Sequence, residues 1–160
     1  MQVRAFEVGD VAWASPLADR LFAAHNEGYG DVVARWAMDP NVSGFVLEDG
    51  APLGFALLGT IGLLGEGQVR VRELLVIAVE PGTRRRGIGR SLLFQAMVEA
   101  RRDGAREIRL TVAHENEAAR ALFNQAGFTV ERFDDGTFAG GQRAMRMRWV
   151  PRPRRGSGEL

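Results

Sequence analysis

A turn rich in glycine and arginine stands between an apolar segment and an amphipathic one near the middle of the chain. The turn reads Thr83-Arg84-Arg85-Arg86-Gly87-Ile88-Gly89-Arg90. The apolar run before it, Leu74 to Val79, predicts a buried strand. The apolar residues after it recur at helical spacing: Ile88, Leu92, Leu93, Ala96, Met97 and Ala100. The chain is therefore expected to fold with a sheet strand leading through a tight turn into a helix.

The start of that helix is suited to an anion. The first backbone N–H groups of a helix have no partner inside the helix, and the macrodipole is positive at that end. Arg84, Arg85, Arg86 and Arg90 crowd the same end. Cations there are unfavourable unless a polyanion, most simply a pyrophosphate, lies among them. The alternative interpretation is a solvated basic loop before an ordinary helix.

Length and composition exclude several classes of protein. A chain of 160 residues is expected to hold one domain, 1–150, followed by a flexible tail, 151–160. The formal net charge of +1 argues against nucleic-acid binding, because acidic residues offset the basic ones. The absence of an 18-residue apolar run or a signal-like N-terminus predicts a cytoplasmic protein without a membrane partner.

Catalysis by several common groups is also excluded. The chain has no cysteine, so thiolate catalysis and cysteine-bound zinc are ruled out. With two histidines, a multi-histidine metal site is not expected, and no metal is predicted. All 21 basic residues are arginine, so Schiff-base and Walker-lysine chemistry cannot occur.

The hydrophobic pattern predicts a mixed α/β (α+β) layered fold. We expect a central sheet of six to seven strands flanked by about four helices. Predicted strands are Val3–Phe6, Gly44–Glu48, Pro52–Leu58, Val69–Val79, Ile108–Val112, Phe128–Phe133 and Arg143–Val150. Predicted helices are one from Asp10 through Phe22, Tyr29–Met38, Ile88–Arg102 and Asn116–Gln125, and Gly62–Gly67 is expected to be a flexible connection.

The glycine turn fits one phosphate-binding motif better than the others. A Walker loop requires lysine, and a dinucleotide fingerprint requires a third glycine or alanine where Leu92 stands. Arg84-x-x-Gly87-x-Gly89 resembles the signature of the GNAT superfamily of N-acetyltransferases. A second segment of that family is similar to Leu110-x-Val112-x-x-x-Asn116-x-x-Ala119-x-x-Leu122-Phe123-x-x-x-Gly127-Phe128. The resemblance covers Val69 to Phe128.

The resemblance implies a GNAT fold and acetyl-coenzyme A as the co-substrate. In the family the turn amides hold the pyrophosphate, glycines at the positions of Gly87 and Gly89 allow close approach, and a side chain at the position of Asn116 contacts the pantetheine arm. The free edge of the central strand would pair with the pantetheine amides. The resemblance therefore assigns to cofactor binding Ile77, Ala78, Val79, Arg84, Arg85, Arg86, Gly87, Ile88, Gly89, Arg90, Asn116 and Phe123. Asn116 could equally serve as an N-cap.

Glu73 is the candidate general base for an amine acceptor. Strict alternation places Val71, Glu73, Leu75 and Ile77 on one face of the strand, where Glu73 is the lone carboxylate. Desolvation there would raise the pKa of Glu73 toward the operating pH. The alternatives are an ion pair with a neighbouring arginine, Arg70 or Arg72, or a role at the strand edge.

The sequence offers several candidates for the group that protonates the leaving thiolate. Many relatives carry tyrosine where this chain has Phe123, which has no proton to give. Tyr29, the only tyrosine, is a candidate acid, and His114 is an alternative acid or base. Water, or no acid at all, would also suffice.

The acceptor is expected to be a primary amine on a small molecule or a peptide N-terminus. Glu73-Leu74-Leu75-x-Ile77-Ala78-Val79-x-Pro81 is similar to the ribosomal-protein alanine N-acetyltransferase branch, although tyrosines of that branch are replaced here by Phe123 and Phe138. The acids Asp31, Asp134 and Asp135 hint at a cationic acceptor.

A non-catalytic acyl-coenzyme A sensor is the alternative function. A homodimer could form through an exposed strand edge or the loop that contains Phe138.

Overall fold

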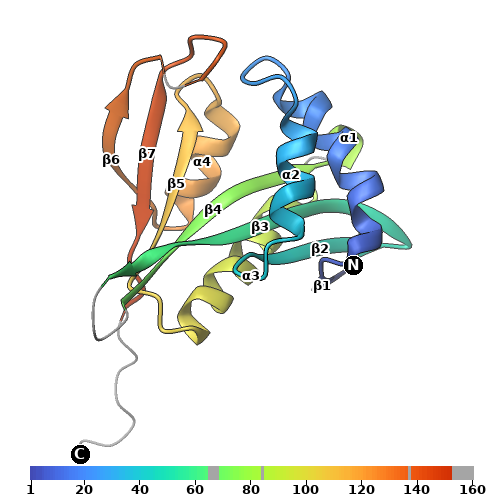
Figure 1. Ribbon diagram of the computed structural model, residues 1–160, viewed down its shortest axis with the longest axis horizontal. Coiled ribbons are helices and arrows are strands. Elements are labelled where there is room, and N and C mark those ends of the chain that lie inside the picture. The colour runs from blue at the N-terminus through green and yellow to red at the C-terminus, as the bar shows by residue number, and fades with distance from the viewer. Residues whose placement is uncertain (65–68, 84, 137, 153–160) are drawn as a thin grey trace, which may run out of the picture.

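The computed structural model describes residues 1–64, 69–83, 85–136 and 138–152 (Figure 1). Within them, one mixed sheet has seven strands in the order β1-β2-β3-β4-β5-β7-β6. All neighbours are antiparallel except the parallel pair β4 and β5. The strands are β1 Gln2–Ala5, β2 Ser43–Asp49, β3 Ala51–Leu64, β4 Val69–Val79, β5 Glu107–Ala113, β6 Thr129–Asp134 and β7 Ala144–Trp149.

Four α-helices cover the sheet on its two faces (Figure 1). Helices α1 (Val11–Phe22) and α2 (Tyr29–Ala37) pack on one face, where their apolar residues form a core with β2, β3 and β4. Helices α3 (Ile88–Arg102) and α4 (Glu117–Gln125) pack on the other face over a second, larger core. Two short 3-10 segments, Val8–Asp10 and Pro81–Thr83, precede α1 and α3. The predicted fold class and element order are confirmed.

The central strand β4 contains a bulge that reverses its alternation. Leu57 of β3 pairs with Val76 and Leu58 pairs with Leu74, so Leu75 is an extra residue on β4. Leu75 and Val76 consequently both pack in the core under α1 and α2. Leu74 and Ile77 pack in the core under α3 and α4. The prediction that Leu75 and Ile77 share a face is therefore wrong, because it assumed an unbroken period of two.

Strands β4 and β5 pair over only part of their length. The parallel pairing joins Val71–Leu74 to Glu107–Leu110 and stops there. Beyond Leu74 the two strands separate, as the divergence of β4 and β5 in Figure 1 shows. Among the described strands, none pairs with the edge of β4 from Leu75 to Val79 on the β5 side. This opening sets the position of the candidate site.

Two local predictions differ from the structure. Residues 62–64 were expected in a flexible connection, but β3 continues to Leu64 by pairing with the start of β4, and residues 65–68 lie outside the described part of the chain. Asp10 precedes α1 as predicted but does not cap it with its side chain. Its carboxylate instead accepts the Glu7 N–H and pairs with Arg4, and these contacts hold the pKa of Asp10 below its ordinary value. The expected tail, 151–160, lies outside the description apart from its first two residues.

Candidate functional site

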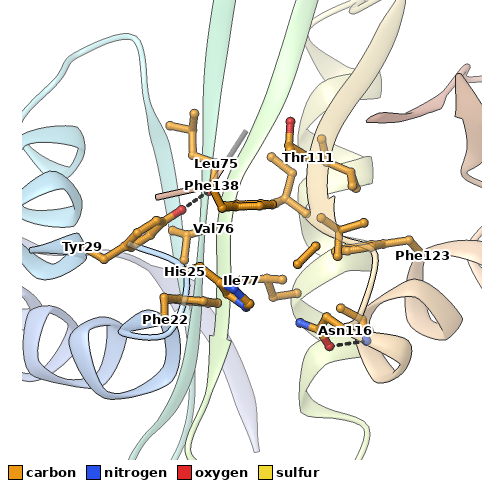
Figure 2. Close-up of a pocket in the computed structure, with 15 residues that line it drawn as sticks. Phe22, His25, Tyr29, Leu75, Val76, Ile77, Thr111, Asn116, Phe123 and Phe138 are labelled. Carbon is orange, nitrogen blue, oxygen red and sulfur yellow. Dashed lines mark hydrogen bonds between the residues drawn. The ribbon is translucent and has the colours of Figure 1, made fainter. Parts of the chain in front are cut away.

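A pocket occupies the gap between β4 and β5 (Figure 2). Its volume is about 90 Å³. The two diverging strands supply its middle walls, through residues 74–77 and 110–113. Helix α4 and the residue before it supply one end: Asn116, Ala119 and Phe123. The region from α1 to α2, with the segment between β6 and β7, supplies the other end: Phe22, His25, Tyr29 and Phe138. The pocket therefore reaches elements on both faces of the sheet.

The turn before α3 has the backbone shape expected of an anion cradle. Gly87 is the N-cap residue of α3 and adopts the left-handed region, with φ 74°. None of the described side chains caps this helix, and its first backbone bond runs from Ser91 N to Gly87 O. The N–H groups of Ile88, Gly89 and Arg90 thus have no partner within the helix. Arg85 is also left-handed, with φ 70°, a conformation that costs energy for a residue other than glycine.

The arginines of the turn have different settings. Arg84 lies outside the described residues. Arg86 forms an ion pair of 3.0 Å with Asp49 in the β2–β3 hairpin. Arg85 and Arg90 are exposed or partly exposed at the start of α3. The structure thus brings the predicted residues Arg85 to Arg90 together at one helix end.

Gly89 is constrained by the protein itself. A Cβ built on Gly89 would lie 3.3 Å from Cδ2 of Leu122 on α4, closer than most Cβ contacts. A Cβ on Gly87 would meet nothing within 4 Å, so its left-handed φ is what favours glycine there. The two glycines therefore serve different ends, close helix packing and backbone conformation.

Asn116 and Phe123 lie at the α4 end of the pocket. Asn116 is the N-cap of α4, and its Oδ1 accepts a hydrogen bond of 3.2 Å from Ala119 N. That bond leaves the amide nitrogen of Asn116 directed into the pocket (Figure 2). Phe123 is buried and packs on Phe128, with ring centroids 5.8 Å apart. Asn116 and Phe123, two of the residues predicted for cofactor contact, therefore line the gap.

Glu73 lies on β4 next to the pocket but is not one of its lining residues. Burial raises the pKa of its carboxyl above the ordinary value, and the charge of Arg146 on β7 opposes part of that rise. The alternative ion pair with Arg72 is wrong, because Arg72 reaches Asp103 at the end of α3, on the opposite face. Within the described part of the chain, Arg70 does not approach Glu73 within ion-pair distance either.

Tyr29 connects α2 to the bulge of β4. Its hydroxyl donates a hydrogen bond of 3.3 Å to the carbonyl of Leu75. Burial, with a smaller contribution from the charge of Glu73, raises the pKa of Tyr29 to about 12. The hydroxyl therefore keeps its proton at neutral pH.

The two histidines lie in different places. His114 follows β5, packs against Phe133 with ring centroids 6.0 Å apart, and does not line the pocket. His25 does line it and was missed by the sequence analysis. A single histidine in the connection between two helices carries no motif, so nothing in the sequence could have singled it out.

Two of the acids that hinted at a cationic acceptor are paired with arginines. Asp134 accepts a hydrogen bond of 2.8 Å from Arg146 and lies 3.5 Å from Arg132. Asp135 pairs with Arg143 at 3.0 Å. These contacts weaken the argument for a cationic acceptor.

Across the described residues, no group of three His, Cys, Asp or Glu side chains could hold a metal ion. None of the described helices is long and apolar enough to cross a membrane.

Comparison with known proteins places this geometry in a family. The sequence profile of the Acetyltransferase (GNAT) family matches residues 11–128. The mycothiol acetyltransferase of Beutenbergia cavernae is 34% identical over 131 residues, which are 77% of this chain. The chain spans 42% of the length of that relative.

Solved structures show the same fold. The ribosomal-protein-alanine N-acetyltransferase of Brucella melitensis aligns with a TM-score of 0.78 at 21% identity, covering 94% of this chain and 100% of that one. The yncA protein of Salmonella typhimurium, solved with its cofactor acetyl-CoA, aligns with a TM-score of 0.80 at 20% identity, covering 99% of this chain and 98% of that one. With the profile match over most of its length, the chain belongs to the GNAT acetyltransferase family.

Proposed function

We propose that this protein is an N-acetyltransferase that moves the acetyl group of acetyl-coenzyme A directly to a primary amine in a ternary complex. The observation that carries the proposal is the pocket in the gap between β4 and β5, which has walls from α4 at one end and from the α1–α2 region at the other. A pocket with two ends on different elements can hold two substrates against each other, as direct transfer requires.

The residues at the α4 end fit a coenzyme. The free N–H groups at the start of α3 are suited to a diphosphate, and Arg85 and Arg90 add positive charge beside them. The unpaired edge of β4 over Ile77, Ala78 and Val79 offers backbone groups to an extended chain that carries amides. The amide nitrogen of Asn116 is free to donate a further hydrogen bond into the gap.

The catalytic roles follow from protonation states. Bound acetyl-coenzyme A supplies a thioester whose carbonyl carbon is the electrophile. Glu73 acts as the general base, and because it does not line the pocket it acts through a water molecule. Its pKa, raised by burial, makes its carboxylate a stronger base than an exposed one.

Tyr29 is the candidate proton donor for the departing thiolate, and it lies in the pocket wall. The hydroxyl of Tyr29 is protonated at neutral pH, since its pKa is about 12. Phe123 has no proton to give, and His114 is outside the pocket wall. Water is the alternative donor for this step.

The acceptor is a primary amine on a small molecule or a peptide N-terminus, and it enters at the end of the pocket lined by Phe22, His25, Tyr29 and Phe138. The sequence relative is named a mycothiol acetyltransferase and the structural relative a ribosomal-protein-alanine N-acetyltransferase, so the relatives do not agree on one acceptor. A homodimer and a cytoplasmic location remain predictions.

The test is release of coenzyme A thiol from acetyl-coenzyme A over a panel of N-terminal peptides, polyamines, amino acids and aminoglycosides. Turnover with one class of amine would establish the activity and name the acceptor class. Calorimetry on the same sample measures acetyl-coenzyme A binding. Tight binding without turnover of any amine would contradict the proposal and favour an acyl-coenzyme A sensor, the alternative that the loss of tyrosine at Phe123 permits.

A further inference from the structure

One polar side chain in the pocket wall forms no hydrogen bond with any of the described residues. Four of the lining side chains are polar, and three of them are engaged: Tyr29 with the Leu75 carbonyl, Thr111 with Arg146 at 2.8 Å, and Asn116 with Ala119 N. The fourth is His25, whose Nδ1 is buried and has no partner among the described residues. Buried polar atoms are nearly always paired, so an unpaired one in a pocket wall indicates a place for a ligand group.

The backbone around His25 is held firmly. His25 N donates to Phe22 O at 2.9 Å, and Gly140 N donates to His25 O at 3.1 Å. The imidazole packs on the ring of Phe138, with centroids 5.3 Å apart. The residues on either side are bonded across the same two segments, Ala24 O to Gln142 Nε2 at 2.8 Å and Asn26 Oδ1 to Ala139 N at 3.1 Å.

These contacts join the α1–α2 connection to the β6–β7 connection. A Cβ on Gly140 would lie 2.4 Å from the Ala24 carbonyl, so the close approach needs glycine. Figure 2 shows the His25 ring pointing from its loop into the pocket, toward Asn116 on the far side. The imidazole is thus fixed at the end of the pocket opposite the α4 end, where an acceptor would enter.

We propose that Nδ1 of His25 accepts a hydrogen bond from the acceptor amine and thereby selects primary over secondary amines. The inference rests on the proposed function, since it concerns the acceptor of that transfer. In this role the imidazole is neutral and carries its proton on Nε2. His25 is an acceptor-binding residue, and the base remains Glu73.

The selectivity follows from counting N–H bonds. When a neutral primary amine attacks, the new C–N bond forms, the C–S bond breaks, and one of the two N–H protons passes through water to Glu73. The other N–H stays in the product amide and keeps its bond to Nδ1 throughout. A secondary amine has a single N–H, which must leave, so its bond to His25 is lost in the transition state. The hydrogen bond to Nδ1 therefore increases the rate of transfer to primary amines only.

The test compares a primary amine, glycinamide, with a secondary amine, sarcosinamide (glycinamide methylated on its α-amino nitrogen), using wild-type protein and His25→Phe, which keeps an aromatic ring against Phe138. We expect kcat/KM for glycinamide to fall about tenfold in the variant, the usual effect of one hydrogen bond. For sarcosinamide kcat/KM should change less than twofold. The Kd of acetyl-coenzyme A, measured by calorimetry without any amine, should stay unchanged.

Two further variants separate the nitrogen from the loop. His25→Asn places an amide oxygen near the position of Nδ1 and should recover part of the selectivity. Asn26→Ala removes the neighbouring bond to Ala139 without touching the imidazole, and should leave the ratio of the two amines as in wild type. The proposal would be overturned if His25→Phe lowered kcat/KM equally for both amines and Asn26→Ala did the same, because this would show a structural role for His25.

Failure of this inference is distinguishable from failure of the proposed function. Unchanged glycinamide kinetics in His25→Phe overturn the role of His25 and leave the acetyltransferase intact. No transfer by wild-type protein to any amine refutes both.

If His25→Phe does not fold, histidine ¹⁵N spectra of wild-type protein with coenzyme A test the role of His25 instead. Glycinamide should move the Nδ1 signal of His25 and not that of His114, and an unmoved His25 signal at amine concentrations that saturate turnover would overturn the role.

Discussion

Arg72 is the most deeply buried charge in the sheet, and its removal gives a prediction that can be worked out from its contacts. Its side chain is 3% exposed. Nε donates to Gly59 O at 2.9 Å, and Nη2 donates to Leu58 O at 2.8 Å and to Ser43 Oγ at 3.1 Å. Nη1 pairs with the carboxylate of Asp103 at the end of α3. The guanidinium thus joins β2, β3 and α3 beside the bulge of β4.

The expected cost of Arg72→Met is about 3 kcal/mol of unfolding free energy. Hydrogen bonds to a charged group contribute about 1.5–3 kcal/mol each, but desolvation of the guanidinium cancels several kcal/mol of the sum. Breaking a buried pair by removing one partner costs about 3–5 kcal/mol. The lower end applies here, because Asp103 is 22% exposed and can be hydrated. For a chain of this size, about 3 kcal/mol lowers Tm by about 6–12 °C.

The assay is urea unfolding followed by circular dichroism, with Arg72→Lys and Asp103→Asn as matched variants. Lysine keeps the charge but cannot reach all four partners, so it should lose most of the same stability. Asp103→Asn leaves a buried cation without a counter-ion. The double variant Arg72→Met with Asp103→Asn should cost less than the sum of the two single changes. A cost below about 1 kcal/mol for Arg72→Met would refute the reasoning, because it would show that desolvation cancels all four contacts.

Three further outcomes are expected. Glu73→Gln should lower kcat by about 10²–10⁴-fold and leave the Kd of acetyl-coenzyme A within twofold. Because burial raises the pKa of Glu73, wild-type activity should fall as the pH drops through a value above the ordinary glutamate range. Equal kcat in the variant and the wild-type protein would exclude Glu73 as the base. Phe123→Tyr should keep or raise kcat in the thiol-release assay, and a large loss would show that the pocket wall has no room for a hydroxyl. Gly87→Ala should cost about 1–2 kcal/mol in thermal unfolding, because φ is 74° there, whereas Gly82→Ala, with open space and no positive φ, should be neutral.

The regular parts of the fold could be predicted from the sequence. Each helix and strand has its own periodicity, and a signal such as the N-cap Asn116 before α4 acts over a few residues. That signal is confirmed, since Asn116 Oδ1 accepts a hydrogen bond from Ala119 N. The glycine turn could also be predicted, because a short segment with two glycines joins an apolar strand to the start of an amphipathic helix.

The irregular parts could not be predicted, for two reasons. Leu74, Leu75, Val76 and Ile77 are all apolar, so no alternation reveals that Leu75 is an extra residue. The place of His25 depends on bonds to a segment more than a hundred positions later in the chain, which leave no local pattern. The partner of Arg72 also left no local pattern. The sequence suggested Glu73 as one alternative, whereas in the structure Arg72 pairs with Asp103 at the end of α3.

The bulge explains why the pocket opens where it does. Leu74 is the last residue of β4 that pairs with β5, and Leu75 is the extra residue that follows it. A bulge bends its strand and increases the local twist, so β4 turns away from β5 just after their last shared pair. The Leu75 carbonyl then accepts the Tyr29 hydroxyl, and the edge beyond it stays free for a ligand. One inserted residue therefore separates the strands, orients the candidate acid and exposes the binding edge together.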